Sequence, residues 1–166
     1  MSISLQRSGI GYDVHRCNEG RKLILGGIEI PHAFGLEGHS DADVLSHAIA
    51  DALLGAIGER DIGHHFPNTD ESIRGISSLE ILRRVGEILA KKNCRVVNVD
   101  ATLIAETPKI GPYLEAMRAK ISAALGLEVT RIGIKATTNE GLGALGRGEG
   151  MAALAVASVE QEEEVC

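Results

Sequence analysis

Three residues, two of them close together and one far along the chain, have side chains that could form a catalytic zinc site. Asp13 and His15 are separated by one residue, so a strand would place both on one face. His47 lies in ADVLSHAIADALLGAIG, whose apolar spacing predicts a helix. Two imidazoles and one carboxylate leave the fourth position of a zinc ion open, as catalytic sites do. A surface Asp13 and a hydrogen-bonded core His47 are the plainer interpretation and stay open here.

Other polar residues surround the predicted helix. Asp43, His47 and Asp51 recur every four residues and therefore share one stripe of it. His39 stands just before the start of the helix, where the positive end of the helix dipole favours anions. An ordinary loop histidine would give the same sequence pattern, so this residue remains a candidate only.

A second candidate set, KATTNE, closes a predicted strand at residues 135–140. The hydroxyls of Thr137 and Thr138 suit phosphate oxygens, and Glu140 could hold a hard cation such as Mg²⁺. Two threonines at a strand end are also common without any ligand.

Familiar catalytic and nucleotide motifs are missing from the sequence. The run GRGEG at residues 146–150 lacks the GK[ST] of a phosphate loop and does not enter a helix as a dinucleotide motif does. No GxSxG is present, and neither Cys17 nor Cys94 has an activating partner. Covalent catalysis is therefore unsupported.

The elements that must position these residues follow from apolar periodicity and turn signals. Strands are expected at 8–16, 22–30, 96–106, 130–138 and 151–159, and helices at 42–58, 77–92 and 113–126. Ser40 or Asp41 is the expected cap of the first helix, and residues 59–72 form a polar loop long enough to suggest function. This order predicts an α+β sandwich with helices on one sheet face, in a single domain 1–166 whose tail frays at about 160–166.

Composition limits the function classes. The net charge is −6 and aromatic residues make up 2%, which argues against a nucleic-acid partner. No stretch approaches the roughly 20 apolar residues of a membrane span, and the first residues do not resemble a secretory signal, so no membrane partner is expected. Three cysteines without CxxC spacing favour the cytoplasm. If the chain binds phosphates, metal ions or backbone N–H groups must supply most of the positive field.

Six segments taken together resemble the cyclodiphosphate synthase family of non-mevalonate isoprenoid synthesis. They are GYDVHR, LILGGIEIP, GHSDADVLSHAIADALLGA, RDIGHHFPNTD, NVDATLIAETPKIGPY and IKATTNEGLGALGRGEG, in family order and across nearly the whole chain. The resemblance implies a ferredoxin-like αβ sandwich with a four-stranded main sheet. It also implies a homotrimer with active sites between subunits.

The same resemblance assigns residues to roles by matching motifs. It implies a zinc site of Asp13, His15 and His47, the first two also touching substrate, and a Mg²⁺ or Mn²⁺ site at Glu140 beside the substrate phosphates. The methylerythritol end would meet His39, Ser40, Asp61, Ile62, Gly63, Phe66 and Asp70. Cytidine and its phosphates would meet Ala105, Pro108, Lys109, Gly111, Thr137 and Thr138. His39 and Thr138 match residues assigned to stabilising the transition state, and Arg147 matches a substrate-binding arginine near the trimer axis.

The reaction so implied converts 4-diphosphocytidyl-2-C-methyl-D-erythritol 2-phosphate to the 2,4-cyclodiphosphate and CMP, by attack of the 2-phosphate on the β-phosphorus. A phosphate dianion is already a nucleophile, so positioning and charge neutralisation suffice. Two alternatives remain on the residues alone. One is a zinc phosphohydrolase that uses the same three ligands. The other is a trimeric nucleotide-binding protein in which zinc is structural, which would require a fourth protein ligand.

Overall fold

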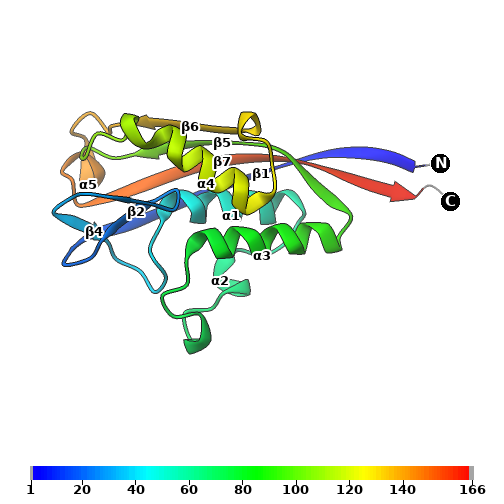
Figure 1. Ribbon diagram of the computed structural model, residues 1–166, viewed down its shortest axis with the longest axis horizontal. Helices are drawn as coiled ribbons and strands as arrows, with labels where there is room; N and C mark the ends of the chain where they lie inside the picture. Colours follow the sequence, from blue (N-terminus) through cyan, green and yellow to red (C-terminus); the bar gives the residue numbers. More distant parts are fainter. Residues whose placement is uncertain (1, 165–166) are drawn as a thin grey trace.

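The structure is a computed structural model that describes residues 2–164, and it consists of a long twisted sheet with helices packed on it (Figure 1). The strands are β1 (Ser2–Glu19), β2 (Leu23–Leu25), β3 (Ile28–Ile30), β4 (Phe34–Leu36), β5 (Cys94–Ile104), β6 (Ile132–Thr137) and β7 (Gly150–Glu164). The α-helices are α1 (Val44–Ala56), α2 (Ile62–His65), α3 (Ser78–Lys91), α4 (Leu114–Leu125) and α5 (Gly143–Gly146). Single 3-10 turns are η1 (Glu71–Ile73), η2 (Gly111–Tyr113) and η3 (Val129–Arg131).

The main sheet has five strands in the order β4-β1-β7-β5-β6, one more than the expected four. The extra strand is β4, which pairs antiparallel with the end of β1 through Cys17 and Leu36. Among the strands of residues 2–164, only β5 and β6 pair in parallel, and α4 lies in the connection between them. The expectation of a mixed α+β fold is confirmed. The resemblance implied four strands in the main sheet, and the structure adds β4, whose three residues carry too little periodic signal to be recognised in the sequence.

The segment expected to be one strand at 22–30 is a hairpin of β2 and β3 in a small sheet of its own. Gly26 and Gly27 form its turn with φ of 56° and 73°. Positive φ at both central residues is the turn geometry that suits a two-residue hairpin, and glycine adopts it without strain. The Gly-Gly pair was the signal for this turn in the sequence.

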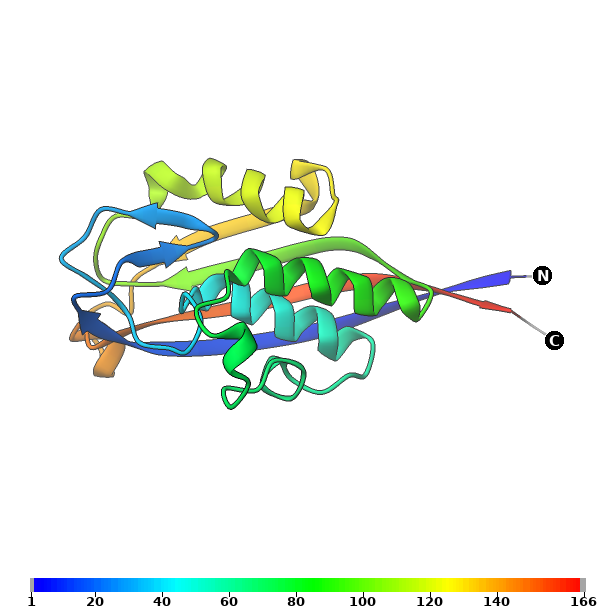
Figure 2. The ribbon, with the colours of Figure 1, turned by 60° about the horizontal axis from the view of Figure 1, so that its bottom comes forward.

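Helices α1, α3 and α4 lie over one face of the main sheet (Figure 2). The alternation of β7 shows which face is covered, because Ala153, Ala155 and Ala157 are buried whereas Leu154 and Val156 are exposed. On β1, likewise, Ile10, Tyr12 and Val14 are exposed. The face opposite the helices is therefore an open surface with several large apolar side chains.

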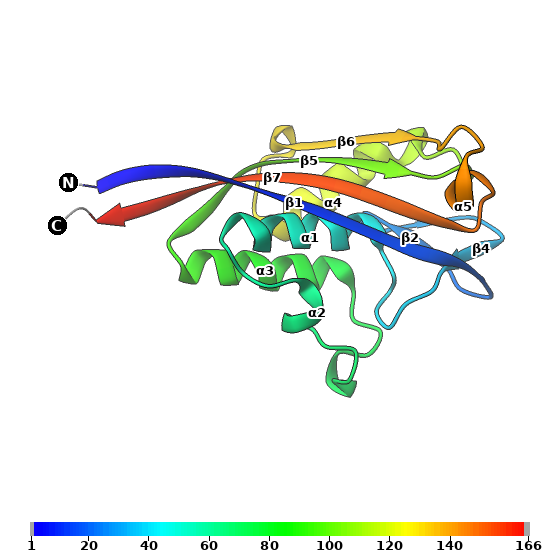
Figure 3. The same ribbon diagram turned by 180° about the vertical axis from the view of Figure 1, so that it is seen from behind.

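Strands β1 and β7 run beyond the helices as an antiparallel ribbon, so that the start of β1 and the end of β7 lie side by side (Figure 3). Ser2 pairs with Glu164, and the tail expected to fray from about 160 is therefore strand as far as Glu164. Residues 165–166 of that expected tail lie outside the described residues. Within residues 2–164, no helix combines the length and the apolar character needed to cross a membrane.

Candidate active site

Two glycines of β1 let helix α1 approach the sheet unusually closely. A Cβ atom built on Gly11 would lie 1.9 Å from the carbonyl oxygen of Ala48, and one on Gly9 would lie 2.1 Å from that of Ala52. Both alanines are on α1, so the backbones of helix and strand touch without intervening side chains. Asp13 continues the same face of β1, two residues beyond Gly11. The close contact therefore brings the helix residue before Ala48 to the carboxylate of Asp13.

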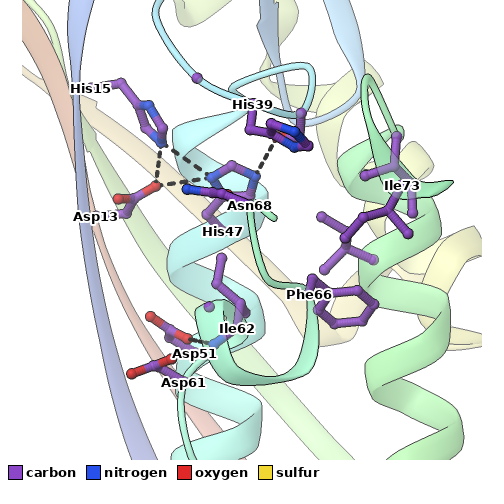
Figure 4. A pocket seen from close by; sticks show the side chains of 15 residues that line it. Asp13, His15, His39, His47, Asp51, Asp61, Ile62, Phe66, Asn68 and Ile73 are labelled. Carbon is purple, nitrogen blue, oxygen red and sulfur yellow. Dashed lines mark hydrogen bonds and ion pairs between the residues drawn. The ribbon is translucent and has the colours of Figure 1, made fainter. Parts of the chain in front are cut away.

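That helix residue is His47, and it completes a cluster with Asp13 and His15 (Figure 4). Nε2 of His15 lies 2.8 Å from Oδ2 of Asp13, and Nδ1 of His47 lies 3.0 Å from the same oxygen. The two ring nitrogens are 3.2 Å apart, and all three ligand atoms fall within 4.8 Å of one another. His47, which is 32 and 34 positions away from His15 and Asp13 in the sequence, thus meets them at one point, as the family resemblance implied.

The donor set fits a divalent cation. Nδ1 of His15 faces the carbonyl oxygen of Glu37, which can only accept, so Nδ1 carries the proton and donates it there. Nε2 of His15 is then left with a lone pair that points to Asp13 and His47. A lone pair and a carboxylate oxygen at hydrogen-bond distance repel each other unless a positive charge lies between them. Neutral imidazoles and a carboxylate at such spacing are the usual ligands of a catalytic zinc ion.

The electrostatics of the cluster agree with this requirement. Burial alone would raise the pKa of Asp13, but hydrogen bonds and charge interactions with His15 and His47 outweigh it and hold that pKa well below its usual value. Burial would lower the pKa of His15, yet the hydrogen bond and charge of Asp13 raise it above its ordinary 6.5. A proton therefore competes with a metal ion for His15.

Binding of a divalent metal ion at this cluster, with zinc as the test ion, should consequently weaken as the pH falls through the raised pKa of His15. The metal needs the unprotonated ring, so affinity should drop about tenfold per pH unit below that pKa and level off above it. Competition with a chromophoric chelator between about pH 8 and about pH 5 measures this, with the chelator's own protonation calibrated separately. A zinc affinity that does not change across this range would show that His15 does not have to lose a proton.

A cavity of about 380 Å³ opens above the cluster. One wall is polar and the other apolar, with Phe66, Ile73, Ile76 and Ile81 among its residues (Figure 4). Of the residues assigned to the methylerythritol end, those that line this cavity are His39, Ser40, Asp61, Ile62, Gly63 and Phe66. Asp70 is not among the lining residues; it caps η1, and its Oδ1 accepts the N–H of Ser72 at 2.9 Å.

Asp51 holds in place the part of the cavity lining formed by the start of α2. Its Oδ1 accepts the N–H of Ile62 at 2.8 Å, which ties α1 to the first residue of α2. Asp61 caps α2 by accepting the N–H of His64 at 2.9 Å. Burial raises the pKa of Asp51, and the nearby carboxylates of Asp61 and Asp13 raise it further. Sequence reasoning placed Asp51 on the stripe of His47 but gave it no role in the site, although the four-residue spacing was the signal.

The third residue of that stripe does not belong to the site. Asp43 is fully buried and is the N-cap of α1, two or three residues later than the expected caps. Its carboxylate accepts the N–H groups of Gly26 at 2.9 Å and of Gly27 at 2.8 Å, and the hydroxyl of Ser46 at 2.7 Å. Asp43 thereby joins the β2–β3 turn to the helix and stays away from Asp13.

A second hollow, of about 320 Å³, lies where β5 and β6 end. The six residues assigned to cytidine and its phosphates all line it: Ala105, Pro108, Lys109, Gly111, Thr137 and Thr138. It shares no lining residue with the first cavity. The structure therefore gathers the predicted substrate residues at two separate places on one chain.

Glu140 follows the second hollow in a strained conformation. Its φ is 52°, a value that residues with a side chain seldom adopt, and its N–H donates to Oγ1 of Thr138 at 3.2 Å. Such strain in a non-glycine residue is commonly retained at functional positions. Arg147 follows α5, where its Nε donates to Glu149 at 2.6 Å, and it lines neither of these two hollows.

Comparison with known proteins gives a consistent result for sequence and structure. A family model described as the YgbB family matches residues 6–160. A 2-C-methyl-D-erythritol 2,4-cyclodiphosphate synthase of Alkaliphilus metalliredigens is 61% identical over 155 residues, which are 93% of this chain and 98% of that protein. The synthase of Symbiobacterium thermophilum is 60% identical over 151 residues, 91% of this chain and 96% of that protein.

Two solved structures share the fold. The bifunctional IspDF of Campylobacter jejuni has a TM-score of 0.92 at 38% identity, covering 96% of this chain and 43% of that one. IspF of Plasmodium falciparum, solved as a CDP complex, has a TM-score of 0.81 at 34% identity, covering 93% and 95%. The chain therefore belongs to the YgbB family, the family of the 2-C-methyl-D-erythritol 2,4-cyclodiphosphate synthases that its motifs indicated.

Proposed function

We propose that this protein converts 4-diphosphocytidyl-2-C-methyl-D-erythritol 2-phosphate to 2-C-methyl-D-erythritol 2,4-cyclodiphosphate and CMP, a step of isoprenoid precursor synthesis. The observation that carries the proposal is the convergence of Asp13, His15 and His47 at the base of a cavity, in a chain of this family. The alternative of a zinc phosphohydrolase is not favoured, because the matching relatives are named as cyclodiphosphate synthases.

The residues of the first cavity would act by positioning the substrate. Asp13, His15 and His47 would hold zinc, which as a Lewis acid would withdraw charge from a phosphate oxygen. The apolar wall with Phe66 would take the carbon skeleton of the methylerythritol, and Asp61 would accept a hydrogen bond from one of its hydroxyls. His39, on the loop just before α1, would donate to a phosphate oxygen as charge develops there. The 2-phosphate is the nucleophile, so none of these side chains has to remove a proton.

The second hollow would bind the cytidine diphosphate part. Thr137 and Thr138 offer hydroxyls at the end of β6, and Glu140 would hold Mg²⁺ or Mn²⁺ against the phosphates. A nucleotide ligand is supported by the CDP complex of the Plasmodium falciparum relative. Arg147 would contact substrate only if the Arg147–Glu149 pair opened.

A homotrimer would unite the two hollows, since no residue lines both of them in one chain. A neighbouring subunit could set its cytidine hollow beside the zinc cavity, as the family resemblance implies. The exposed apolar side chains of β1 and β7, such as Ile10 and Tyr12, support an association through the open sheet face. The proposal includes one ferredoxin-like domain per subunit and a cytoplasmic location for the enzyme.

Replacing Glu140 with glutamine should raise the Mg²⁺ concentration needed for half-maximal turnover by about tenfold or more, because the amide carries no charge for the cation. Zinc content, measured by elemental analysis, should not change. Glu128→Gln is the matched control, since Glu128 is an exposed carboxylate that lines neither hollow. Loss of zinc from the Glu140 variant would show that Glu140 helps to bind zinc and that its assignment to Mg²⁺ is wrong.

The proposed reaction is tested by ³¹P NMR of the protein with Mg²⁺ and 4-diphosphocytidyl-2-C-methyl-D-erythritol 2-phosphate. A cyclic diphosphate should appear in step with CMP. Inorganic phosphate or a linear product would instead indicate a hydrolase. No change in a protein with zinc bound would show that the chain keeps the family's fold without its activity.

A further inference from the structure

The ring of His47 has a second polar neighbour, on the side away from Asp13. Ser78, the first residue of α3, is fully buried, and its Oγ lies 2.9 Å from Nε2 of His47. Oγ of Ser78 also bonds to Oδ1 of Asp41. We propose that Asp41 and Ser78 are positioning residues, which fix the tautomer and orientation of His47 so that Nδ1 presents a lone pair to the metal. The inference rests on the metal-dependent function proposed for this site.

The direction of the protons follows from the chemistry of the three groups. A carboxylate oxygen can only accept, so the single hydroxyl hydrogen of Ser78 must go to Asp41. Oγ of Ser78 can then only accept from the ring of His47. Nε2 of His47 must therefore carry the ring proton, and Nδ1 is left free to bind a cation.

Asp41 is itself held so that this direction cannot easily reverse. Its Oδ2 accepts the backbone N–H of Ser78 at 2.9 Å, so the carboxylate accepts hydrogen bonds from both the backbone and the hydroxyl of Ser78. Its Oδ1 also accepts the N–H of Asp43 at 3.2 Å. Oγ of Ser40 lies 3.1 Å from Nε2 of His47 as well, but it accepts the N–H of Ala42 and is joined to no such carboxylate. Ser78 is thus the neighbour whose proton direction is fixed.

Two backbone hydrogen bonds also tie the segment just before α3 to the loop that carries His39. The N–H of Gly75 donates to the carbonyl oxygen of His39 at 3.1 Å, and the N–H of Asp41 donates to that of Ile76 at 3.2 Å. Asp41 and Ser78 therefore sit at the join between the metal ligand His47 and the rim of the cavity. The two histidine ligands use different nitrogens, since His15 donates through Nδ1 to Glu37.

The first test uses the unchanged, zinc-loaded protein. Long-range ¹H–¹⁵N NMR of the histidine rings should show His47 with its proton on Nε2 and His15 with its proton on Nδ1. A proton on Nδ1 of His47 would overturn the proposal, and no variant has to fold for this result.

The second test measures zinc affinity without substrate, by chelator competition, in Ser78→Ala and Asp41→Asn. Each should weaken zinc binding by about 10- to 100-fold, as loss of an outer-shell partner does. The double variant should lose no more than the worse single variant, because both residues act on one ring nitrogen. Zinc affinity within about twofold of the unchanged protein in both single variants would overturn the proposal.

Ser77→Ala is the matched control, because Ser77 caps the same helix from an exposed position and accepts the N–H of Leu79 at 3.3 Å. This substitution should destabilise the first turn of α3 and leave zinc affinity unchanged. If Ser77→Ala weakens zinc as much as Ser78→Ala, the effect belongs to the helix end and the positioning role is refuted. A chain that passes these zinc tests but forms no cyclic product by ³¹P NMR would contradict the proposed function alone.

Discussion

Replacing His47 with alanine is expected to abolish zinc binding and to reduce turnover by at least about a thousandfold, while the chain stays folded. His47 supplies one of three ligand atoms, and alanine leaves two, because no other His, Cys, Asp or Glu among residues 2–164 belongs to this cluster. The fold should survive because the core under α1 is apolar, with Leu45, Ile49 and Leu53 fully buried. Elemental analysis gives the zinc content, ³¹P NMR gives the turnover, and circular dichroism reports folding.

His64→Ala is the matched control for this experiment. His64 is exposed on α2 and belongs to neither the metal cluster nor the cavity lining, so its loss should change neither zinc content nor turnover. If a metal-depleted His47→Ala protein turned substrate over at the normal rate, His47 would have no part in the mechanism.

Replacing Gly11 with alanine is expected to destabilise the protein by about 3 kcal/mol, at the upper end of overpacking effects. The added methyl would lie 1.9 Å from the carbonyl oxygen of Ala48 and 2.8 Å from the nitrogen of Ala52. These are backbone atoms of α1, which cannot rotate away as a side chain can, so the whole helix must shift. His47 moves with it, and zinc affinity should fall together with the free energy of unfolding. Urea denaturation and chelator competition measure the two effects.

Gly86→Ala provides a control of the same chemical change in a different setting. Gly86 lies inside α3, and a Cβ there would meet nothing within 4 Å. Alanine should stabilise that helix by about 1 kcal/mol and leave zinc affinity unaltered. A Gly11→Ala protein with normal stability and normal zinc affinity would refute the idea that direct backbone contact positions His47.

The sequence predicted the long elements well, because their periodicity is carried by near neighbours. The helix expected at 77–92 is α3 at Ser78–Lys91, and the strand expected at 96–106 is β5 at Cys94–Ile104. The first helix begins later than expected because Ala42, with a φ of 59°, is not helical and Asp43 is the cap. The hairpin at Gly26 and Gly27 was missed for a different reason. Its strands are three residues each, too short to alternate visibly.

The sequence by itself determined the kinds of ligand present and the fact that Asp13 and His15 share one face of a strand, since both depend on residue type and local geometry. It also carried the family motifs that the comparisons confirm. Only the tertiary structure decided that His47 meets Asp13, because that contact depends on the backbones of α1 and β1 touching at Gly9 and Gly11.

The roles proposed for Asp41 and Ser78 were likewise hidden in the sequence. They stand 37 residues apart, and Ser78 approaches His47 only when α3 has packed beside α1. Hydrogen-bond partners across such distances are selected by how helices and strands pack, and a single sequence records no direct trace of that packing. Local chemistry therefore named the candidate metal ligands, whereas long-range packing decided which nitrogen of each histidine faces the cluster.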